Sequence, residues 1–257
     1  MRIPEGDNVR SVCMTDRETL ARVRDRFAPD LVIHSAGVCD LDVCEERTEW
    51  AHDLNVNGTA NIVDLFADRP ILFVSTDLVF SGENPPLSGD SEDDPTDPIS
   101  VVGRTFRLAE DEIARAPDWA ILRLGLPTGD SIQGKKGAID WIENRFRRGL
   151  PATLFHDEWH SCIDCDELSA CVFEFLERGG RGLYHLGGPK AWSLHAIAER
   201  VLARGNYNPT LLSTCSRHEE VNGPPRVGNL GLDSKKIEQL LERPIRPCRW
   251  HETSTSS

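Results

Sequence analysis

Two apolar runs of this sequence end in polar and small residues. Several of these residues are of the types that carry out acid–base chemistry. The runs cover residues 29–37 and 69–77, and they end in His34, Ser35, Ala36, Gly37, Ser75, Thr76 and Asp77. If the runs are parallel strands, these residues lie at the carboxyl edge of a sheet, where such sheets bind ligands. His34 is then a candidate general base with Asp77 as its partner. The alternative is a buried histidine whose hydrogen bonds are satisfied within the fold.

Residues 129–149 carry the main group of positive charges in an acidic chain. The group consists of Lys135, Lys136, Arg145, Arg147 and Arg148, with Gly129, Gly134 and Gly137 nearby. Glycines let a loop approach a phosphate closely, so an anion site is one interpretation, and a solvated helix face is the other. Trp141 and Trp159 suit stacking on a base or a sugar, or burial in a core.

The cysteines and one acidic stretch raise the question of a metal site. Cys162 and Cys165 form a single CxxC, and the stretch around them also holds His156, Asp157, Glu158, His160, Asp164 and Asp166. A structural zinc site needs a second pair of ligands at matching spacing, which this stretch lacks. We therefore expect free thiols and no metal.

The composition argues against several classes of function. The 257 residues suffice for one sizeable core, and 39% of them are hydrophobic. The net charge of -13 argues against nucleic acids and anionic membranes as partners, because carboxylates repel phosphate. No apolar run is long enough for a membrane span or a signal peptide, so we expect a cytoplasmic protein.

Apolar runs alternate with amphipathic segments, which indicates an α/β fold with a parallel sheet covered on both faces. The expected strands are residues 29–37, 69–77, 119–127 and 182–189. The expected helices are residues 16–27, 45–67, 105–116, 137–149, 165–179, 193–205 and 233–244. Asp16 or Thr15 is expected to cap the first helix, and the second is expected to break near Asn57 and Gly58. Residues 81–100 form a long irregular loop, which indicates a functional or a mobile segment.

Six motifs occur in an order and spacing that resembles a known family. They are "PDLVIHSAGVCDLDVCEE", "LNVNGTANIV", "VSTDLVFSG", "EDDPTDPISVVGRT", "LRLGLPTGDS" and "LYHLGGP". Together they are similar to extended short-chain dehydrogenase/reductases, and most of all to the dTDP-4-dehydrorhamnose reductase-like (RmlD-like), sugar-nucleotide-binding branch. The resemblance implies a Rossmann-like parallel sheet flanked by helices, with a small C-terminal substrate-binding lobe.

The resemblance also implies a division of the chain. Residues 1–128 and 160–190 are expected to form a Rossmann-like NAD(P)-binding-type domain, residues 129–159 and 191–250 a substrate-binding lobe, and residues 251–257 a disordered tail.

In the family a glycine-rich loop after the first strand holds the pyrophosphate of NAD(P). This chain enters after that point, at "VRSVCMTDRETL", so the domain is expected to be incomplete and shortened at the N-terminus. We expect either a start at a downstream methionine of a longer gene or a shortened form. The strand "DLVIHSA" is then an apolar edge, which residues 9–13 or a second subunit are expected to cover.

The family's active site resembles a Thr, Tyr, Lys constellation, in which the tyrosine donates a proton and the lysine lowers its pKa and holds the nicotinamide ribose. Thr76 matches the threonine, but Val102 and Phe106 stand where the tyrosine and the lysine are expected. The only tyrosines, Tyr184 and Tyr207, are distant in sequence. These departures predict that the chain does not perform the family's NAD(P)H-dependent reduction.

We therefore expect a degenerate member of the family that binds a nucleotide-sugar-like ligand or acts as a non-catalytic partner. The alternatives are an active NAD(P)-dependent reductase or epimerase with another proton donor, such as His34 or water, and a dimeric scaffold joined at the open sheet edge. By resemblance the cofactor-binding positions are His34, Ser35, Ala36, Gly37 and Ser75, and the cofactor is NADP or NAD if one binds. The substrate-binding positions are Asp77, Lys135, Lys136, Trp141 and Arg226, the last matching an arginine near the nucleotide diphosphate.

Overall fold

The computed structural model describes residues 10–129, 137–219 and 223–248. The candidate residues Lys135 and Lys136 and the predicted tail at 251–257 lie outside these ranges. Among the described helices, none combines the length and the apolar composition needed to cross a membrane.

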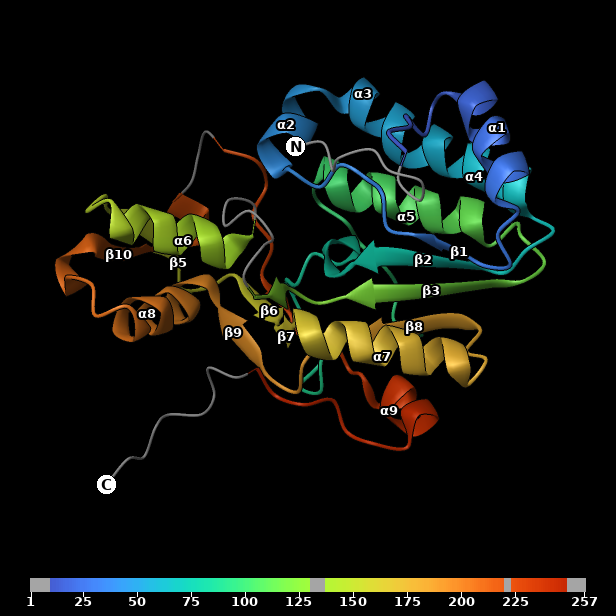
Figure 1. Cartoon of the computed structure of the whole chain (residues 1–257). Coiled ribbons are helices and arrows are strands. Elements are labelled where there is room, and N and C mark those ends of the chain that lie inside the picture. Colours follow the sequence, from blue (N-terminus) through green and yellow to red (C-terminus); the bar gives the residue numbers. More distant parts are fainter. Residues whose placement is uncertain (1–9, 130–136, 220–222, 249–257) are drawn as a thin grey trace.

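A four-stranded parallel sheet forms the centre of the fold, as the apolar runs predicted (Figure 1). Its strands, in spatial order, are β1 (Val32–His34), β2 (Ile71–Thr76), β3 (Trp119–Leu124) and β8 (Gly182–Leu186). All three pairings are parallel, so the four carboxyl ends lie along one edge of the sheet. Polar residues at these ends are thereby brought together although they are far apart in sequence.

Helices cover the sheet on both faces, which Figure 1 shows from the side. One face carries α1 (Arg17–Phe27), α2 (Leu41–Glu46), α3 (Thr48–His52), α4 (Gly58–Phe66) and α5 (Val101–Ile113), and the other carries α7 (Cys165–Glu177) and α9 (Lys235–Leu241). Apolar side chains of α1, α4 and α5 form one core with β1 and β2, and those of α7 and α9 form a second with β3 and β8. The expected Rossmann-like α/β class is confirmed.

The largest differences between predicted and observed helix boundaries concern two helices. The predicted helix 45–67 is divided, because a break at Arg47 separates α2 from α3, and the π-helical turn Asp53–Asn57 joins α3 to α4. Helix α5 begins at Val101, four residues earlier than predicted, because the Ser100 hydroxyl accepts the Gly103 N–H and caps it. Asp16 caps α1 by accepting the Thr19 N–H at 3.0 Å.

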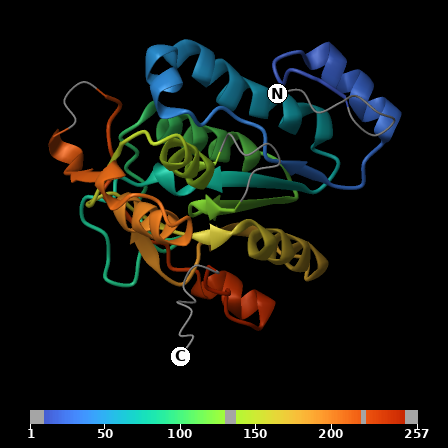
Figure 2. The same ribbon diagram turned by 60° about the vertical axis from the view of Figure 1, so that its left-hand side comes forward.

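A third core lies beside the carboxyl end of the central sheet, as Figures 1 and 2 show from two sides. It is built by α6 (Ala138–Arg147), α8 (Leu194–Arg204), β5 (Ala152–Phe155) and β10 (Leu212–Cys215). Shorter strands join it to the sheet, namely β4 (Pro127–Thr128), β6 (Trp159–Ser161), β7 (Ile163–Asp164), β9 (Ala191–Ser193) and β11 (Asn229–Leu230). Segments of two or three residues carry too little periodicity to be predicted from sequence.

The long loop at residues 81–100 is held by backbone hydrogen bonds to the 228–233 segment. Gly228 N–H donates to the Ser81 carbonyl at 2.8 Å, and Asn229 N–H donates to the Gly82 carbonyl at 2.9 Å. The two chains approach so closely that a Cβ on Gly82, whose φ is +69°, would lie 2.6 Å from the Asn229 nitrogen. The loop therefore connects the sheet to the C-terminal part of the fold.

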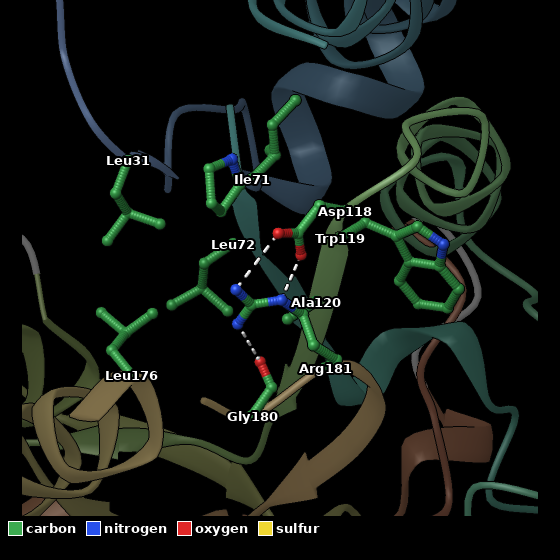
Figure 3. Close-up of a pocket in the computed structure, with 10 residues that line it drawn as sticks. Leu31, Ile71, Leu72, Asp118, Trp119, Ala120, Leu176, Gly180 and Arg181 are labelled. Atoms are coloured by element: carbon green, nitrogen blue, oxygen red, sulfur yellow. Dashed lines mark hydrogen bonds and ion pairs between the residues drawn. The ribbon is translucent and has the colours of Figure 1, made fainter. Parts of the chain in front are cut away.

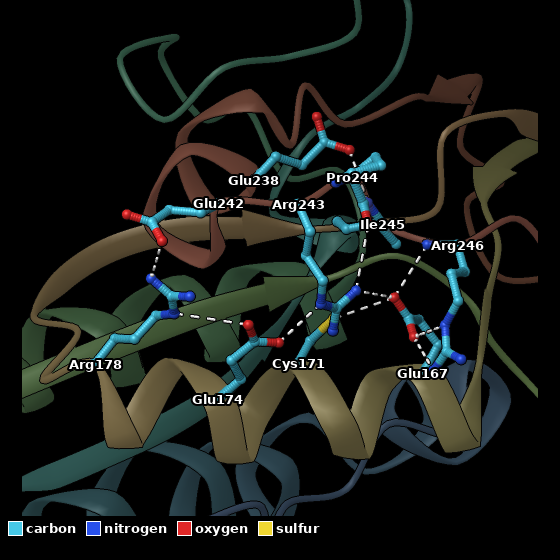
Figure 4. A network of polar contacts seen from close by, with 10 residues as sticks. All are labelled: Glu167, Cys171, Glu174, Arg178, Glu238, Glu242, Arg243, Pro244, Ile245 and Arg246. Carbon is cyan, nitrogen blue, oxygen red and sulfur yellow. Dashed lines mark hydrogen bonds and ion pairs between the residues drawn. The ribbon is translucent and has the colours of Figure 1, made fainter.

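A buried carboxylate fastens the segment after α9 to helix α7 (Figure 4). Glu167 is 3% exposed, and its Oε1 accepts hydrogen bonds from Arg243 Nη1 at 2.6 Å and from the Arg246 N–H at 3.0 Å. Its Oε2 accepts Arg246 Nε at 2.5 Å. One side chain thus satisfies three donors from the C-terminal segment.

Replacing Glu167 with alanine is expected to lower the unfolding free energy by about 1–3 kcal/mol, because its donors lose charged hydrogen bonds and Arg243 is only partly able to reach water. Urea unfolding followed by circular dichroism measures this change. The control is Glu242→Ala, which removes an exposed partner of Arg178 in the same network. Losses of equal size in the two variants would contradict an anchoring role for Glu167.

Candidate functional site

A hydrogen-bonded chain of polar residues occupies the carboxyl end of β2. Thr76 Oγ1 donates to Asp77 Oδ1 at 3.2 Å, and Asp77 Oδ2 lies 2.7 Å from His160 Nδ1. On its other side, His160 Nε2 lies 3.6 Å from Glu158 Oε1. Asp77 follows β2 and His160 belongs to β6, so the contact joins the central sheet to the strands beside the third core.

This cluster is an imidazolium held between two carboxylates. Asp77, Glu158 and His160 are all less than a tenth exposed. Burial by itself lowers the pKa of His160, but the charge and hydrogen bond of Asp77, together with Glu158, raise that pKa to about 10. His160 is therefore protonated at neutral pH and lies as an imidazolium between the side chains of Asp77 and Glu158.

Two polar atoms near this cluster lack partners within the described part of the chain. Glu158 Oε2 and Arg226 Nε are buried without a hydrogen bond. Arg226 stacks its guanidinium carbon 5.0 Å from the centre of the Phe155 ring, and its carbonyl accepts Arg217 Nη1. Arg217 itself is bound to Glu83, so of these two arginines Arg226 has the side chain with an unused donor.

Of the two interpretations of His34, the structure agrees with the buried histidine whose hydrogen bond is satisfied within the fold, and the pairing with Asp77 is wrong. His34 is 3% exposed, and its Nε2 lies 2.9 Å from the Thr59 hydroxyl of α4. Burial lowers the pKa of His34 to about 4, which keeps the ring neutral. His34 is thus a buried histidine facing the helices, and the histidine that partners Asp77 is His160.

Ser75 takes part in a second buried network beneath the site. Its hydroxyl donates to Glu110 Oε1 at 2.6 Å, and Glu110 forms a two-point ion pair with Arg123 at 2.9 and 2.8 Å. Arg123 Nη1 also lies 3.4 Å from His185 Nε2 on β8. This network links β2, α5, β3 and β8 and directs the Ser75 side chain into the fold.

Val102 and Phe106 are packed into the first two turns of α5. Val102 is fully buried and Phe106 is 8% exposed. The Phe106 ring stacks on Phe73 with centroids 6.0 Å apart, and a Cβ on Gly37 would lie 2.9 Å from Phe106 Cζ. An aromatic side chain therefore fills the space beside the turn that follows β1.

The remaining sequence candidates are dispersed. Ser35, Ala36 and Gly37 are exposed after β1. Trp141 is 47% exposed on α6, with Arg145 over its ring at 5.2 Å, while Trp159 is half-buried in β6. Among the described residues, no group of three or more His, Cys, Asp or Glu side chains is placed to hold a metal ion.

Sequence reasoning gave no catalytic, cofactor-binding or substrate-binding role to four residues that organise the site. Asn55, in the π-helical turn, exchanges hydrogen bonds with both the N–H and the carbonyl of Val38 and also donates to Thr105. The other three are Glu110, Arg123 and His160. A charge in the apolar run "WAILRLGL" demands a buried partner, so Arg123 carried a signal. His160 was considered only as part of the stretch weighed for a metal site, and nothing in the sequence indicated its pairing with Asp77, which is 83 residues away.

The parallel sheet, its helical layers and the polar residues at its carboxyl edge define a Rossmann-like protein of the short-chain dehydrogenase/reductase type. Residues 6–256 match the model of the RmlD substrate binding domain, and the chain belongs to this family of sugar-nucleotide reductases.

Relatives with known names include enzymes and a subunit of a complex. The chain is 28% identical over 264 residues to the dTDP-4-dehydrorhamnose reductase of Sinorhizobium fredii, covering 93% of this chain and 82% of that one. It is 24% identical over 234 residues to the methionine adenosyltransferase 2 subunit beta of Danio rerio, covering 88% of this chain and 72% of that one.

Solved structures share the fold. A hypothetical dTDP-4-dehydrorhamnose reductase from Sulfolobus tokodaii superimposes with a TM-score of 0.83 at 24% identity, over 97% of this chain and 88% of that one. The Bordetella bronchiseptica enzyme WbmG, in complex with NAD and UDP, gives 0.75 at 22% identity, over 91% and 72%.

Proposed function

We propose that this chain binds a nucleotide-sugar-like ligand and does not carry out the NAD(P)H-dependent reduction of its family. The observation that carries the proposal is the packing of Val102 and Phe106 into α5, at the positions where the family's tyrosine and lysine are expected. Reduction of a carbonyl by hydride needs a proton donor at the oxygen, and neither side chain can give a proton.

No tyrosine elsewhere in the chain takes over this role. Tyr184 lies in β8 and packs edge-on against Phe175 of α7, with ring centroids 5.1 Å apart. Tyr207 packs against Phe146 in the third core. His34 is neutral and hydrogen-bonded to Thr59, which also argues against it as the replacement donor.

Arg226 supports a ligand with a diphosphate. Its partly buried guanidinium has an unused donor, and a charged donor shielded from water binds phosphate oxygens strongly. The proposal places the ligand between a Rossmann-like domain, residues 1–128 and 160–190, and a substrate lobe, residues 129–159 and 191–250. Thr76 lies at the same edge, is half-buried and fits contact with a sugar hydroxyl. Asp77, which is buried, orients the Thr76 hydroxyl through its Oδ1.

The test is calorimetric and thermal-shift titration of the chain with NADPH, NADH and a panel of dTDP- and UDP-sugars. Ligands of the native state raise the melting temperature with concentration, so we expect stabilisation by a nucleotide sugar. We expect Arg226→Met to weaken that binding about 10- to 100-fold, since it removes charged hydrogen bonds. The control is Arg22→Met, which alters an exposed arginine paired with Glu18.

The alternative is an active NAD(P)-dependent reductase or epimerase with a different proton donor. Tight binding of NADPH, followed by its oxidation in the presence of a nucleotide sugar, would establish that alternative and refute the proposal. Binding of nucleotide sugars without consumption of NADPH supports the proposal that the chain is a non-catalytic binding protein. A partner role is the second candidate, because a named relative is a subunit of an adenosyltransferase and, among the described strands, β1 has a neighbour on one side only.

A further inference from the structure

A carboxyl group in the loop at residues 81–100 is buried without a partner for one of its oxygens. Asp90 is 8% exposed, and its Oδ2 is among three buried side-chain atoms that lack a hydrogen bond within the described part of the chain. The other two, on Glu158 and Arg226, lie near the candidate site. A buried carboxyl group that receives no donor is destabilised when it carries a charge, so this position disfavours an ionised aspartate.

The charged groups of another recess are paired within the chain, in contrast to Asp90. That recess is a hollow at the amino ends of β2 and β3, shown in Figure 3. Arg181 forms an ion pair there with Asp118 and donates from Nη1 to the Gly180 carbonyl at 2.8 Å. Both charged side chains of the hollow are therefore satisfied.

Two further carboxyl groups of the loop accept donors from the loop itself. Asp94 Oδ2 accepts the N–H and the hydroxyl of Ser91, both at 2.7 Å. Asp97 accepts the N–H of Ser81 at 2.8 Å and its hydroxyl at 2.6 Å. Burial, together with the charges of Asp94 and Asp97, raises the pKa of Asp90 to about 6.

The backbone of Asp90 joins the loop to the C-terminal part of the fold. Its N–H donates to the Gly231 carbonyl and its carbonyl accepts the Asp233 N–H, both at 2.8 Å. The same carbonyl accepts Nδ1–H of His185 in β8 at 2.9 Å. At Gly89, whose φ is +86°, a Cβ would lie 2.6 Å from the Gly231 oxygen. This close pairing holds the Asp90 side chain in its buried position, and exposing that side chain to water involves separating the loop from residues 231–233.

The charged and titratable groups of the surrounding elements do not neutralise Asp90. They are Glu92 of the loop, His185 of β8, Arg123 of β3, and Asp233, Lys235 and Lys236 at the start of α9. Burial, with Arg123 nearby, lowers the pKa of His185 to about 4, and Arg123 is paired with Glu110. None of these groups donates to Asp90 Oδ2.

We propose that Asp90 makes the loop at residues 81–100 a pH-sensitive strap, which is held against residues 228–233 when Asp90 is protonated and loosens when Asp90 ionises. Protonation removes the buried charge and its repulsion by Asp94 and Asp97. Residues 228–233 follow Arg226 closely, so the strap also holds the segment beside that arginine. The proposal concerns the loop and does not depend on the proposed function.

The direction of the pH effect follows from the raised pKa of Asp90. The docked loop holds a proton that a freely exposed aspartate, with a pKa of 3.8, releases. The contribution of Asp90 to docking is therefore complete below pH 3.8 and is lost as the pH rises through about 6. The strap is expected to be tighter at pH 5 than at pH 7.5.

Hydrogen exchange of the Asp233 amide, followed by NMR at pH 5 and pH 7.5, measures the opening of the strap, because this amide donates to the Asp90 carbonyl. Each rate is divided by the intrinsic exchange rate at that pH to give an opening constant. Relative to Asp90→Asn, the opening constant of the unaltered chain is expected to rise about tenfold between the two pH values. The comparison with Asp90→Asn cancels the contribution of His185, whose protonation on opening acts in the opposite direction.

The matched control is Asp93→Asn, which removes an exposed carboxyl group of the same loop and is expected to keep the tenfold change. The Leu122 amide of β3 reports on opening of the whole fold and is expected to exchange more slowly than the Asp233 amide. The same pH dependence in the unaltered chain and in Asp90→Asn overturns the proposal. So does loss of the change in Asp93→Asn, or equal opening constants at Asp233 and Leu122, because the loop would then open only with the whole fold.

Discussion

Replacement of Arg123 with methionine is expected to lower the unfolding free energy by about 3–5 kcal/mol, the typical loss when one partner of a buried ion pair is removed. Arg123 and Glu110 are 4% and 3% exposed and are joined by two hydrogen bonds. Without the guanidinium, the Glu110 carboxylate stays buried, and the Ser75 hydroxyl is its one remaining hydrogen-bond donor among the described residues. Urea unfolding monitored by tryptophan fluorescence measures the loss.

The double variant Arg123→Met/Glu110→Leu provides the control for this interpretation. It removes both charges at similar volume, so we expect it to be more stable than the Arg123→Met variant. An additive loss, in which the second substitution costs as much as the first, would show that packing and not the unpaired charge sets the effect. Substitution of Arg22 in the exposed pair with Glu18 is expected to have an effect too small to resolve.

Stability is expected to fall as the pH rises from about 7 to 8.5, by up to about 1.4 kcal/mol per pH unit, because of His160. The folded pKa of this histidine is raised from 6.5 to about 10, so the folded state holds a proton that the unfolded state releases. The contribution of His160 to the unfolding free energy is complete below pH 6.5 and is lost as the pH rises through about 10. His34 and His185, whose pKa values are lowered to about 4, are neutral in both states in this window.

Unfolding free energies at several pH values test this dependence. In His160→Gln the slope is expected to become much shallower, and the part that remains comes from buried thiols such as Cys44 and Cys171, whose pKa values burial raises to about 11. The variant is also expected to be less stable at pH 7, since Asp77 and Glu158 then share a buried site without a cation. In His195→Gln, which changes a histidine of α8, the slope is expected to remain. Persistence of the full slope in His160→Gln would show that other groups produce it.

The four central strands and their helices follow from periodicity, which is a local property of the chain. Apolar runs of six to nine residues and helical spacing of leucine, valine and phenylalanine specify which segments pair and which face is buried. The division of the predicted 45–67 helix was not accessible in this way, because it reflects how Asn55 reaches across to Val38 and Thr105. The same holds for the two- and three-residue strands, which exist only because neighbouring segments pair with them.

The contacts of the candidate site were even less predictable from sequence than the short strands. The sequence places His34 and Asp77 at the carboxyl ends of neighbouring strands, but it does not state the direction of either side chain. In the structure His34 points to Thr59 of α4, and Asp77 points to His160 on a strand that follows 83 residues later. Partners of this kind come from chain segments that only the folded arrangement brings within hydrogen-bond distance.

By itself, the sequence determined the α/β class and the family resemblance. It also led to the prediction that Val102 and Phe106 stand where the family's tyrosine and lysine are expected. These depend on residue type and order along the chain, which sequence states directly. Only the tertiary structure decided that His160 is the partner of Asp77 and that Arg123 is paired with Glu110. Those facts depend on side-chain direction and on contacts between distant segments, and no local pattern of residues encodes either.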